Sequence, residues 1–476
     1  TSGLKMLLVT ADGTILAENT QTYPVSYPNP GWSEQNPEDW FAAALRGLEQ
    51  LLAGQDKSKV RGISFGGQMH GLVALDESDN VIRPAILWND GRTEEETQYL
   101  NEVIGKEKLS AWTGNIAFAG FTAPKLLWMK KHESENFAKI KKIMLPKDYL
   151  VYRLSGAFST DFSDASGMLL LDVKNRRWSR EMCDVCGISE QMLPELHESY
   201  EVVGMLKQEI ADKFGLKDVK IIAGAGDNAA AAVGTGVVGE GGCNISLGTS
   251  GTLFVSSASY KEDKVNALHS FCHADGGWHL MGCILSAASC NSWWVNGILQ
   301  STDYKKEEDG LDEVIGQNDV YFLPYLMGER SPHNDVTARG SFIGMRPDTT
   351  RKIMTLAMLE GVTFALRDCL EAAKKNGAVI PRTKLCGGGA KSKLWRKIVA
   401  NVMNLPVDIP QTEQGPGFGA AMLAMVGCGE YISVQQAADA IVRIKETVLP
   451  DPEIAAQYEK RYHHFTKLYP ALKGLF

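Results

Sequence analysis

The sequence predicts an α/β protein built from two domains. Predicted strands and helices alternate along all 476 residues, which is typical of α/β architecture. A chain of this length exceeds what one hydrophobic core supports, so we expect two large domains. Glycine-rich turns follow several of the apolar strands, and such turns let backbone N–H groups approach a bound anion.

The composition is that of an ordinary globular protein. Hydrophobic residues make up 44% and charged residues 22% of the chain, and the formal net charge is −8. An acidic chain has no long-range attraction to nucleic acid or anionic lipid. No segment approaches the roughly 20 apolar residues that span a bilayer, and no secretory signal is visible. We therefore expect a cytoplasmic protein with neither a nucleic-acid nor a membrane partner.

The first elements carry clear boundary signals. The apolar stretch from Leu4 to Thr10 and the stretch from Ile15 to Tyr23 flank an Asp-Gly bend, which predicts a hairpin. Residues 36–53 predict a helix, because Asn36 can cap it, Pro37 suits its first position and Gly54 follows its end.

Three later strands each end in glycines. They are the buried strands predicted at residues 60–65 and 219–223, and Lys384-Leu385 before Gly387-Gly388-Gly389. The glycine-rich stretch 234–242 is the best candidate for a domain boundary, which divides the chain into residues 1–235 and 236–476.

A short sequence motif, Thr-Ser-Gly, occurs near the start of both halves. Thr1-Ser2-Gly3-Leu4 precedes one predicted strand, and Leu247-Gly248-Thr249-Ser250-Gly251-Thr252-Leu253 precedes another. Both copies lie at the start of a half-chain. Two related domains, each opening with a phosphate-binding hairpin, would give this pattern.

Asp227 is the leading catalytic candidate. It follows the strand at 219–223 and Gly224-Ala225-Gly226, directly before a run of small residues that predicts a helix. A carboxylate there lies at the mouth of a sheet and at a helix N-terminus. It could equally be an ordinary N-cap residue. The same glycines resemble a dinucleotide fingerprint, but the next strand, Asn244 to Leu247, supplies no acidic residue to complete it.

Two small-residue loops are candidates for phosphate contacts. Gly248–Gly251 and Gly387–Ala390 both follow predicted strands, and glycines there would not obstruct a phosphate. Helices are predicted at residues 392–404 and from Gly415 onward.

Other polar clusters have two interpretations. Gln68-Met69-His70-Gly71 and Trp88-Asn89-Asp90-Gly91-Arg92 could contact a polyol, or could be a structural histidine and a turn. His269, Cys272, His273, His279 and Cys283 could suggest zinc, but their spacing favours core packing. The nine cysteines include a Cys183–Cys186 pair, which we interpret as coincidental because no second pair accompanies it.

Taken together, these segments resemble the FGGY family of carbohydrate kinases over essentially the whole chain. The motifs that carry the resemblance are 31–35, 67–71, 87–92, 121–125, 145–150, 226–230, 247–251 and 387–390. The Gln-Met-His-Gly and Trp-Asn-Asp-Gly-Arg motifs are specific, since glycerol kinases differ at both places. A pentulose is the substrate class that they indicate.

The resemblance implies two ribonuclease-H-like domains of the actin and hexokinase type around a central cleft. It implies Asp227 as catalytic base, with ATP and Mg²⁺ as cofactors. It leaves open a homodimer, a different polyol as substrate, and a non-catalytic sugar- or nucleotide-binding regulator. The residues it places against the sugar are Met69, His70, Asp227 and Asn228, and those it places against ATP are Ser2, Gly3, Thr249, Ser250, Gly389 and Ala390. It also implies that Gly389 leaves room for a ligand because it lacks a side chain.

One departure from the family concerns the start of the chain. The family opens with a strand that ends in Asp-x-Gly-Thr, and its aspartate helps to organise magnesium. Here Thr1-Ser2-Gly3 has no apolar lead-in, whereas Asn244–Leu247 precedes the second copy. We expect a short apolar strand ahead of Thr1, and we assign no metal ligand within this sequence.

Overall fold

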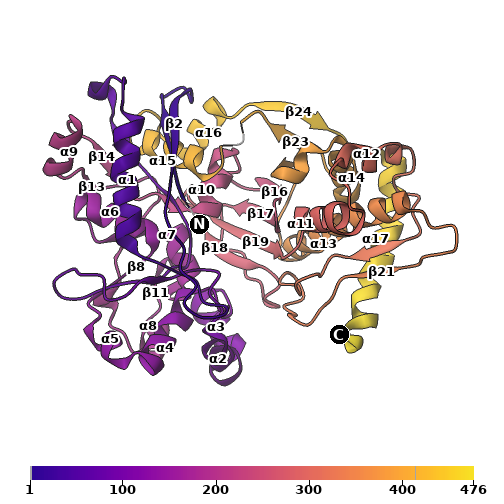
Figure 1. Ribbon diagram of the computed structural model, residues 1–476, viewed down its shortest axis with the longest axis horizontal. Coiled ribbons are helices and arrows are strands. Elements are labelled where there is room, and N and C mark those ends of the chain that lie inside the picture. The colour runs from indigo at the N-terminus through magenta and orange to yellow at the C-terminus, as the bar shows by residue number, and fades with distance from the viewer. Residues whose placement is uncertain (1–2, 413) are drawn as a thin grey trace.

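The computed structural model describes residues 3–412 and 414–476, in which helices and strands alternate along the chain (Figure 1). Most of the first half lies on one side of the view and most of the second half on the other. The predicted α/β class is confirmed. Among the described residues, no helix is long and apolar enough to cross a membrane.

The predicted hairpin and first helix are both present. Strands β1 (Gly3–Val9) and β2 (Ile15–Thr22) pair antiparallel, and Asp12 Oδ1 accepts a hydrogen bond of 3.1 Å from the Thr14 amide in the turn. Helix α1 (Pro37–Leu51) is capped by Asn36, whose side chain accepts from the Glu38 amide at 3.1 Å. These local signals therefore fix both elements as expected.

Short sheets form the first half. Strand β14 (Lys220–Ile222) pairs antiparallel with β13 (Val202–Met205) and parallel with β4 (Gly62–Ile63). Strand β15 (Ala225–Gly226) pairs parallel with β5 (Gly66–Gly67), so the residues that follow these two strands emerge side by side. The other strand pairs are β3 (Glu34–Gln35) with β7 (Ala85–Ile86), β6 (Val73–Leu75) with β8 (Lys142–Met144), β9 (Ser159–Asp161) with β12 (Glu195–His197), and β10 (Leu171–Asp172) with β11 (Arg177–Trp178).

The strand predicted at residues 60–65 differs from expectation. Only Gly62 and Ile63 form a strand, and Val60, Ile63 and Phe65 are half-buried rather than buried. The reason is a cavity of about 790 Å³ that lies between β1 and β4 and separates their sheets. The strand expected ahead of Thr1 stays a prediction.

One mixed sheet of seven strands organises the second half. Its order is β18-β19-β17-β16-β22-β23-β24, and β16 pairs antiparallel with β17 and parallel with β22. The strands are β16 (Cys243–Leu247), β17 (Gly251–Ser257), β18 (His269–Cys272), β19 (Trp278–Ile284), β22 (Thr383–Cys386), β23 (Val407–Pro410) and β24 (Ile444–Val448), with β20 (Tyr321–Leu323) and β21 (Ser341–Ile343) apart as a hairpin.

Helices complete both halves. The long helix α13 (Arg351–Lys375) is buried over most of its length in the apolar core of the seven-stranded sheet. The predicted helix at 392–404 is α14 (Lys393–Met403), capped by Ser392. The remaining helices are α2 (Glu94–Gln98), α3 (Lys106–Thr113), α4 (Thr122–His132), α5 (Ser134–Lys139), α6 (Pro146–Ser155), α7 (Phe162–Ala165), α8 (Arg180–Cys186), α9 (Gln208–Phe214), α10 (Asp227–Gly234), α11 (Ala288–Ser292), α12 (Tyr304–Glu308), α15 (Pro416–Cys428), α16 (Val434–Ile441) and α17 (Pro452–Leu472).

Helices α10 and α15 join the two halves at backbone distance. Although α15 comes late in the chain, it lies beside α10 (Figure 1). A Cβ atom at Gly419 would lie only 1.7 Å from the Ala230 carbonyl oxygen, and one at Gly234 would lie 2.9 Å from the Gly419 nitrogen. Phe418 and Met422 of α15 share an apolar cluster with Ala229 and Val233 of α10. The two helices can approach this closely only because glycines stand at the crossing.

Replacing Gly419 with valine should therefore disrupt the junction of the halves. The new side chain has no space against the Ala230 carbonyl, so we expect the free energy of unfolding to fall by at least about 1–3 kcal/mol, the usual cost of overpacking. Urea unfolding would measure this. Gly474→Ala is the matched control, because a Cβ atom at that position would have no other atom within 4 Å. Equal stability of the two variants would contradict the close crossing.

Candidate active site

Two neighbouring strand ends bring the predicted sugar-contact residues together. Met69 and His70 follow β5, Asp227 and Asn228 follow β15, and these strands are parallel neighbours. Asn228 Nδ2 lies 3.8 Å from Met69 Sδ and donates to Asp227 Oδ1 at 3.1 Å. All four residues therefore form one cluster at the carboxyl ends of the strands, where open α/β sheets commonly bind ligands.

Asp227 is the first residue of α10 and not its N-cap. The N-cap position belongs to Gly226, so the alternative interpretation of Asp227 as a capping residue is wrong. The side chain lines the cavity of about 790 Å³, together with Gly3 and Gly67. The surrounding protein still withdraws the carboxylate from water, and this burial raises the pKa of Asp227 to about 6. Such a carboxylate is ionised at neutral pH but holds a proton readily.

His70 is fixed by contacts on one ring nitrogen and on its backbone. Its Nδ1 lies 2.7 Å from the Gly167 carbonyl oxygen, which can only accept, so Nδ1 carries the proton and Nε2 is left as an acceptor. Its own carbonyl accepts from Lys125 Nζ at 2.8 Å and from Thr122 Oγ1 at 3.1 Å. Burial lowers the pKa of His70 to about 3, so the ring is neutral.

The two predicted phosphate loops lie against each other. The turn at residues 248–250 joins β16 to β17, and its carbonyls accept hydrogen bonds from the start of α11, with Ala288 N 2.8 Å from Gly248 O. A Cβ at Gly387, where φ is +90°, would lie 2.7 Å from the Leu247 carbonyl. The structure therefore brings Thr249 and Ser250 next to the Gly387–Ala390 turn, with Thr249 exposed to solvent.

The expected reason for glycine at position 389 is wrong. A Cβ there would meet Leu247 Cβ and the Trp395 ring, both at 2.8 Å, so the missing side chain makes room for protein rather than for a ligand. Gly389 and Ala390 are buried, whereas Gly388 is exposed with nothing within 4 Å of its Cβ position. The open position of this loop is therefore Gly388. Ser2, the remaining predicted ATP contact, lies outside the described residues.

Comparison with known proteins identifies the chain. The N-terminal-domain model of the FGGY family of carbohydrate kinases matches residues 1–234, and the C-terminal-domain model matches residues 243–428.

This chain belongs to the FGGY family of carbohydrate kinases.

Individual relatives of this FGGY kinase match it over their full lengths. The xylulose kinase of Escherichia coli (strain K12) is 40% identical over 479 residues, covering 100% of this chain and 98% of the relative. A crystal structure of a "xyloylose kinase" from Brucella ovis has a TM-score of 0.95 at 40% identity, with 100% and 98% of the two chains covered. A gluconate kinase from Lactobacillus acidophilus reaches 0.94 at 26% identity, with 99% and 96% covered. The two-domain FGGY fold is thus confirmed, and fold likeness alone does not separate the substrates.

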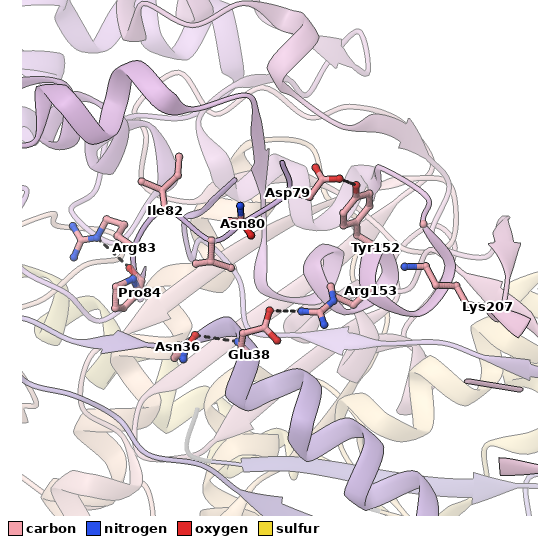
Figure 2. Close-up of a pocket in the computed structure, with 12 residues that line it drawn as sticks. Asn36, Glu38, Asp79, Asn80, Ile82, Arg83, Pro84, Tyr152, Arg153 and Lys207 are labelled. Atoms are coloured by element: carbon pink, nitrogen blue, oxygen red, sulfur yellow. Dashed lines mark hydrogen bonds and ion pairs between the residues drawn. The ribbon is translucent and has the colours of Figure 1, made fainter. Parts of the chain in front are cut away.

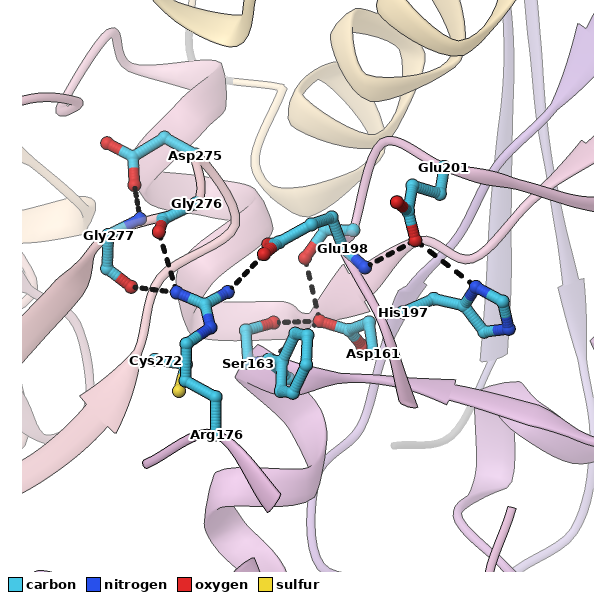
Figure 3. Close-up of polar contacts among 12 residues, drawn as sticks. Asp161, Ser163, Arg176, His197, Glu198, Glu201, Cys272, Asp275, Gly276 and Gly277 are labelled. Carbon is cyan, nitrogen blue, oxygen red and sulfur yellow. Dashed lines mark hydrogen bonds and ion pairs between the residues drawn. The ribbon is translucent and has the colours of Figure 1, made fainter. Parts of the chain in front are cut away.

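A buried ion cluster supports the turn that carries Asp227. Lys147 Nζ lies 2.6 Å from Asp148, 2.8 Å from Asp161 and 3.7 Å from Asp164. Asp161 in turn accepts from the Ser163 hydroxyl (Figure 3). Ser163 Oγ itself accepts from the Gly226 amide at 3.1 Å. A chain of polar contacts therefore runs from Lys147 to the residue that precedes Asp227.

The same cluster contains an aspartate, Asp164, whose pKa is raised by burial and by the charge of Asp227 among others. Burial raises the pKa of Asp164 well above its usual value, and the charges of neighbouring aspartates, Asp227 among them, raise it further. Burial alone would lower the pKa of Lys147, but its three carboxylate neighbours raise it above its usual value. One buried lysine thus faces three carboxylates, and the pKa of Asp164 stays well above its usual value.

A second polar contact ties this region to the other half. Arg176 donates to the Gly276 carbonyl at 2.6 Å and pairs with Glu198 at 2.5 Å (Figure 3). Asp275, beside Gly276, accepts from the Gly239 amide at 2.7 Å. The turn between β18 and β19 is therefore held both by the first half and by the glycine-rich connector.

Sequence reasoning missed Lys125 and Arg330 near His70, and it gave a third neighbour, His269, only a packing role. Lys125 lies in a motif that carried the family resemblance but received no role, and burial lowers its pKa to about 7. His269 and Arg330 come from the second half: the His269 ring packs 5.7 Å from Phe121, and Arg330 lies over Phe118 at 5.3 Å. Only the fold brings them there, since both lie about 200 or more positions away along the chain.

The structure shows how the histidines and cysteines that could have suggested a metal site are placed. His279 stacks on Phe254 at 4.0 Å and His269 on Phe271 at 5.4 Å, which is core packing. Cys183 and Cys186 are buried free thiols in α8, and burial raises the pKa of both, to about 11 and about 12.

The Trp88–Arg92 segment is a structural turn rather than an open polar site. The Asp90 carboxylate is buried and accepts from Arg92 Nε at 2.8 Å and from the Ser33 amide at 2.6 Å. Arg92 in turn lies over the Trp32 ring at 3.7 Å. Trp88 itself remains 45% exposed.

A second cavity, of about 750 Å³, lies apart from this site (Figure 2). Several of its charged side chains are already paired, Arg153 with Glu38 and Asp79 with the Tyr152 hydroxyl at 2.6 Å. None of the predicted sugar or ATP residues lines it. We therefore assign it no part in catalysis.

The residues around Asp227 do not form a protein cage for Mg²⁺. Among the described residues, no cluster of three metal-ligating side chains includes Asp227. Mg²⁺ commonly keeps phosphate oxygens and waters as ligands, and it neutralises charge on nucleotide phosphates. We therefore assign it no protein ligand.

Ser163→Ala should loosen the turn that holds Asp227. The change leaves the Gly226 amide without its partner and removes one of the three hydrogen bonds that Asp161 Oδ2 accepts. We therefore expect unfolding to become easier by about 1–3 kcal/mol and kcat to fall more than the sugar KM rises. Denaturant unfolding and steady-state kinetics would measure both. Ser58→Ala, which removes an exposed hydroxyl bonded to Asp56, is the control. A variant with unchanged stability and kcat would show that the network does not support Asp227.

Proposed function

We propose that this chain catalyses the ATP-dependent phosphorylation of D-xylulose to D-xylulose 5-phosphate. The observation that carries the proposal is the cluster at the ends of β5 and β15, where a carboxylate with a pKa of about 6 stands beside Asn228 and near His70. The substrate assignment is supported by the full-length likeness to the xylulose kinase of E. coli. We propose the cytoplasm as its location.

Asp227 would act as general base. The C5 hydroxyl of the sugar gives its proton to the Asp227 carboxylate as its oxygen bonds to the γ-phosphorus of ATP. The bond between that phosphorus and the β–γ bridging oxygen breaks, and ADP leaves. A base is most effective when its pKa lies near the working pH, so the raised pKa of Asp227 suits this role.

The neighbouring residues would position the sugar. His70 Nε2 is available as an acceptor for a sugar hydroxyl, because Nδ1 is committed to Gly167. Asn228 can donate to another hydroxyl, and Met69 offers an apolar wall beside it. On the nucleotide side we propose backbone contacts from Gly3, Thr249, Ser250, Gly389 and Ala390, with Gly388 as the position open to ligand. We retain residues 1–235 and 236–476 as the proposed domains.

Asp227→Asn should keep the fold and lower kcat by about 10²–10⁴-fold, the usual contribution of a positioned base. ADP release in the presence of D-xylulose would measure it, with the exposed Asp348→Asn as control. In the wild type, activity should rise as the pH increases through about 6. The Asp227 carboxyl group can accept a proton only when it is ionised, which requires a pH above its raised pKa. A variant within a few-fold of wild type would exclude Asp227 as base, and an acidic limb near the ordinary aspartate pKa of about 3.9 would exclude the raised pKa.

D-xylulose should give a higher kcat/KM than D-ribulose, gluconate or glycerol. His70→Ala should raise the KM for the sugar more than the KM for ATP, because it removes an acceptor from the sugar side alone. A substrate panel with each ligand varied in turn would test both statements. A higher kcat/KM for any of the other three compounds would assign the enzyme to that substrate instead, and equal losses for both ligands in His70→Ala would indicate misfolding rather than lost recognition.

A further inference from the structure

A carboxylate outside the active site is buried without a hydrogen-bond partner. Glu96 lies in the short helix α2 and is only 5% exposed. Neither of its two carboxylate oxygens has a hydrogen-bond partner among the described residues. Removing a carboxylate from water costs free energy unless another group compensates its charge. Buried carboxylates are therefore usually paired with a cation or bound to a metal.

Two further ligand-type side chains meet Glu96. His132, the last residue of α4, has its Nε2 3.6 Å from Glu96 Oε1, and one ligand atom of Glu95 completes a group within 4.8 Å. In tetrahedral geometry, two ligands at zinc distances of about 2.0–2.1 Å lie roughly 3.3 Å apart. The separation of His132 and Glu96 is thus longer than a hydrogen bond and close to that of two ligands of one metal.

The surroundings hold the imidazole in place and leave a path for an ion. The His132 ring stacks on Trp128, with ring centres 5.2 Å apart and an interplanar angle of 27°. The side chains of His132 and Glu95 are 42% and 73% exposed, so the site opens to solvent. Lys131 Nζ hydrogen-bonds one Glu95 oxygen at 2.6 Å, which leaves the other oxygen of that carboxylate for a metal.

We propose that Glu95, Glu96 and His132 form a binding site for Zn²⁺ that braces α2 against the end of α4. One imidazole and two carboxylates are ligands that zinc accepts, whereas Mg²⁺ and Ca²⁺ prefer oxygen ligands alone. Three protein ligands leave a fourth position for water. The two carboxylates balance the charge of the ion, and Glu96 gains the partner that it lacks.

Thermal unfolding with and without ZnCl₂, in the presence of excess MgCl₂, tests the site. Zn²⁺ should raise the Tm of the wild type, because an ion that binds only the folded state stabilises it. Glu96→Gln and His132→Gln should abolish that rise. His463→Gln should keep it, since His463 belongs to an exposed pair with Glu459 that resembles the site only in composition. Without zinc, Glu96→Gln should be at least as stable as the wild type, because it removes a buried charge that has no hydrogen bond.

The location of the ion decides the proposal independently of the variants. A crystal soaked with ZnCl₂ should show an anomalous peak among the three side chains. A peak confined to other residues, no Tm rise in the wild type, or an equal rise in all variants would overturn the proposal. Kinase activity plays no part in these readouts, so the outcome does not depend on the proposed reaction.

Discussion

The crossing of α10 and α15 at Gly419 and Ala230 is the contact on which the site depends. Helix α10 begins with Asp227, and α15 begins with Pro416, which occupies the space that a side chain at Gly66 would need. The contact therefore fixes the positions of the ends of β5 and β15 relative to each other. Because it is made by backbone atoms, it leaves little freedom for side chains to adjust. The position of Asp227 is thus determined mainly by packing of small residues and only secondarily by hydrogen bonds.

The charges buried around Asp227 determine how readily the site exchanges protons. Asp227 is ionised but shares its surroundings with a buried cluster in which one lysine, Lys147, faces three aspartates. Burial disfavours the charged form of these carboxylates, and it raises the pKa of Asp164 well above its usual value. The same network holds the Gly226 turn through the Ser163 hydroxyl. The buried charges therefore also help to fix the position of Asp227, which follows that turn.

Local signals made much of the fold predictable. The Asp-Gly hairpin, the Asn36 cap with Pro37, and the Ser392-capped helix follow from residues within a few positions of each other. The site cluster around Asp227 was predicted only through the family resemblance, and the structure brings its residues together because β5 and β15 are neighbours. Features set by distant partners were not: the half-buried strand beside the cavity, the packing of Leu247 and Trp395 on Gly389, and the approach of Arg330 to Phe118 all depend on tertiary contacts.

The role of Asp227 as acceptor of the proton from the phosphorylated sugar hydroxyl is tested most directly by a crystal structure with D-xylulose and a non-hydrolysable ATP analogue. We expect the C5 hydroxyl oxygen about 2.6–3.2 Å from an Asp227 carboxylate oxygen, the reach of a general base, and on the side facing the γ-phosphate. A bound sugar whose C5 hydroxyl faces another residue, with Asp227 beyond hydrogen-bond reach in the closed complex, would contradict this role.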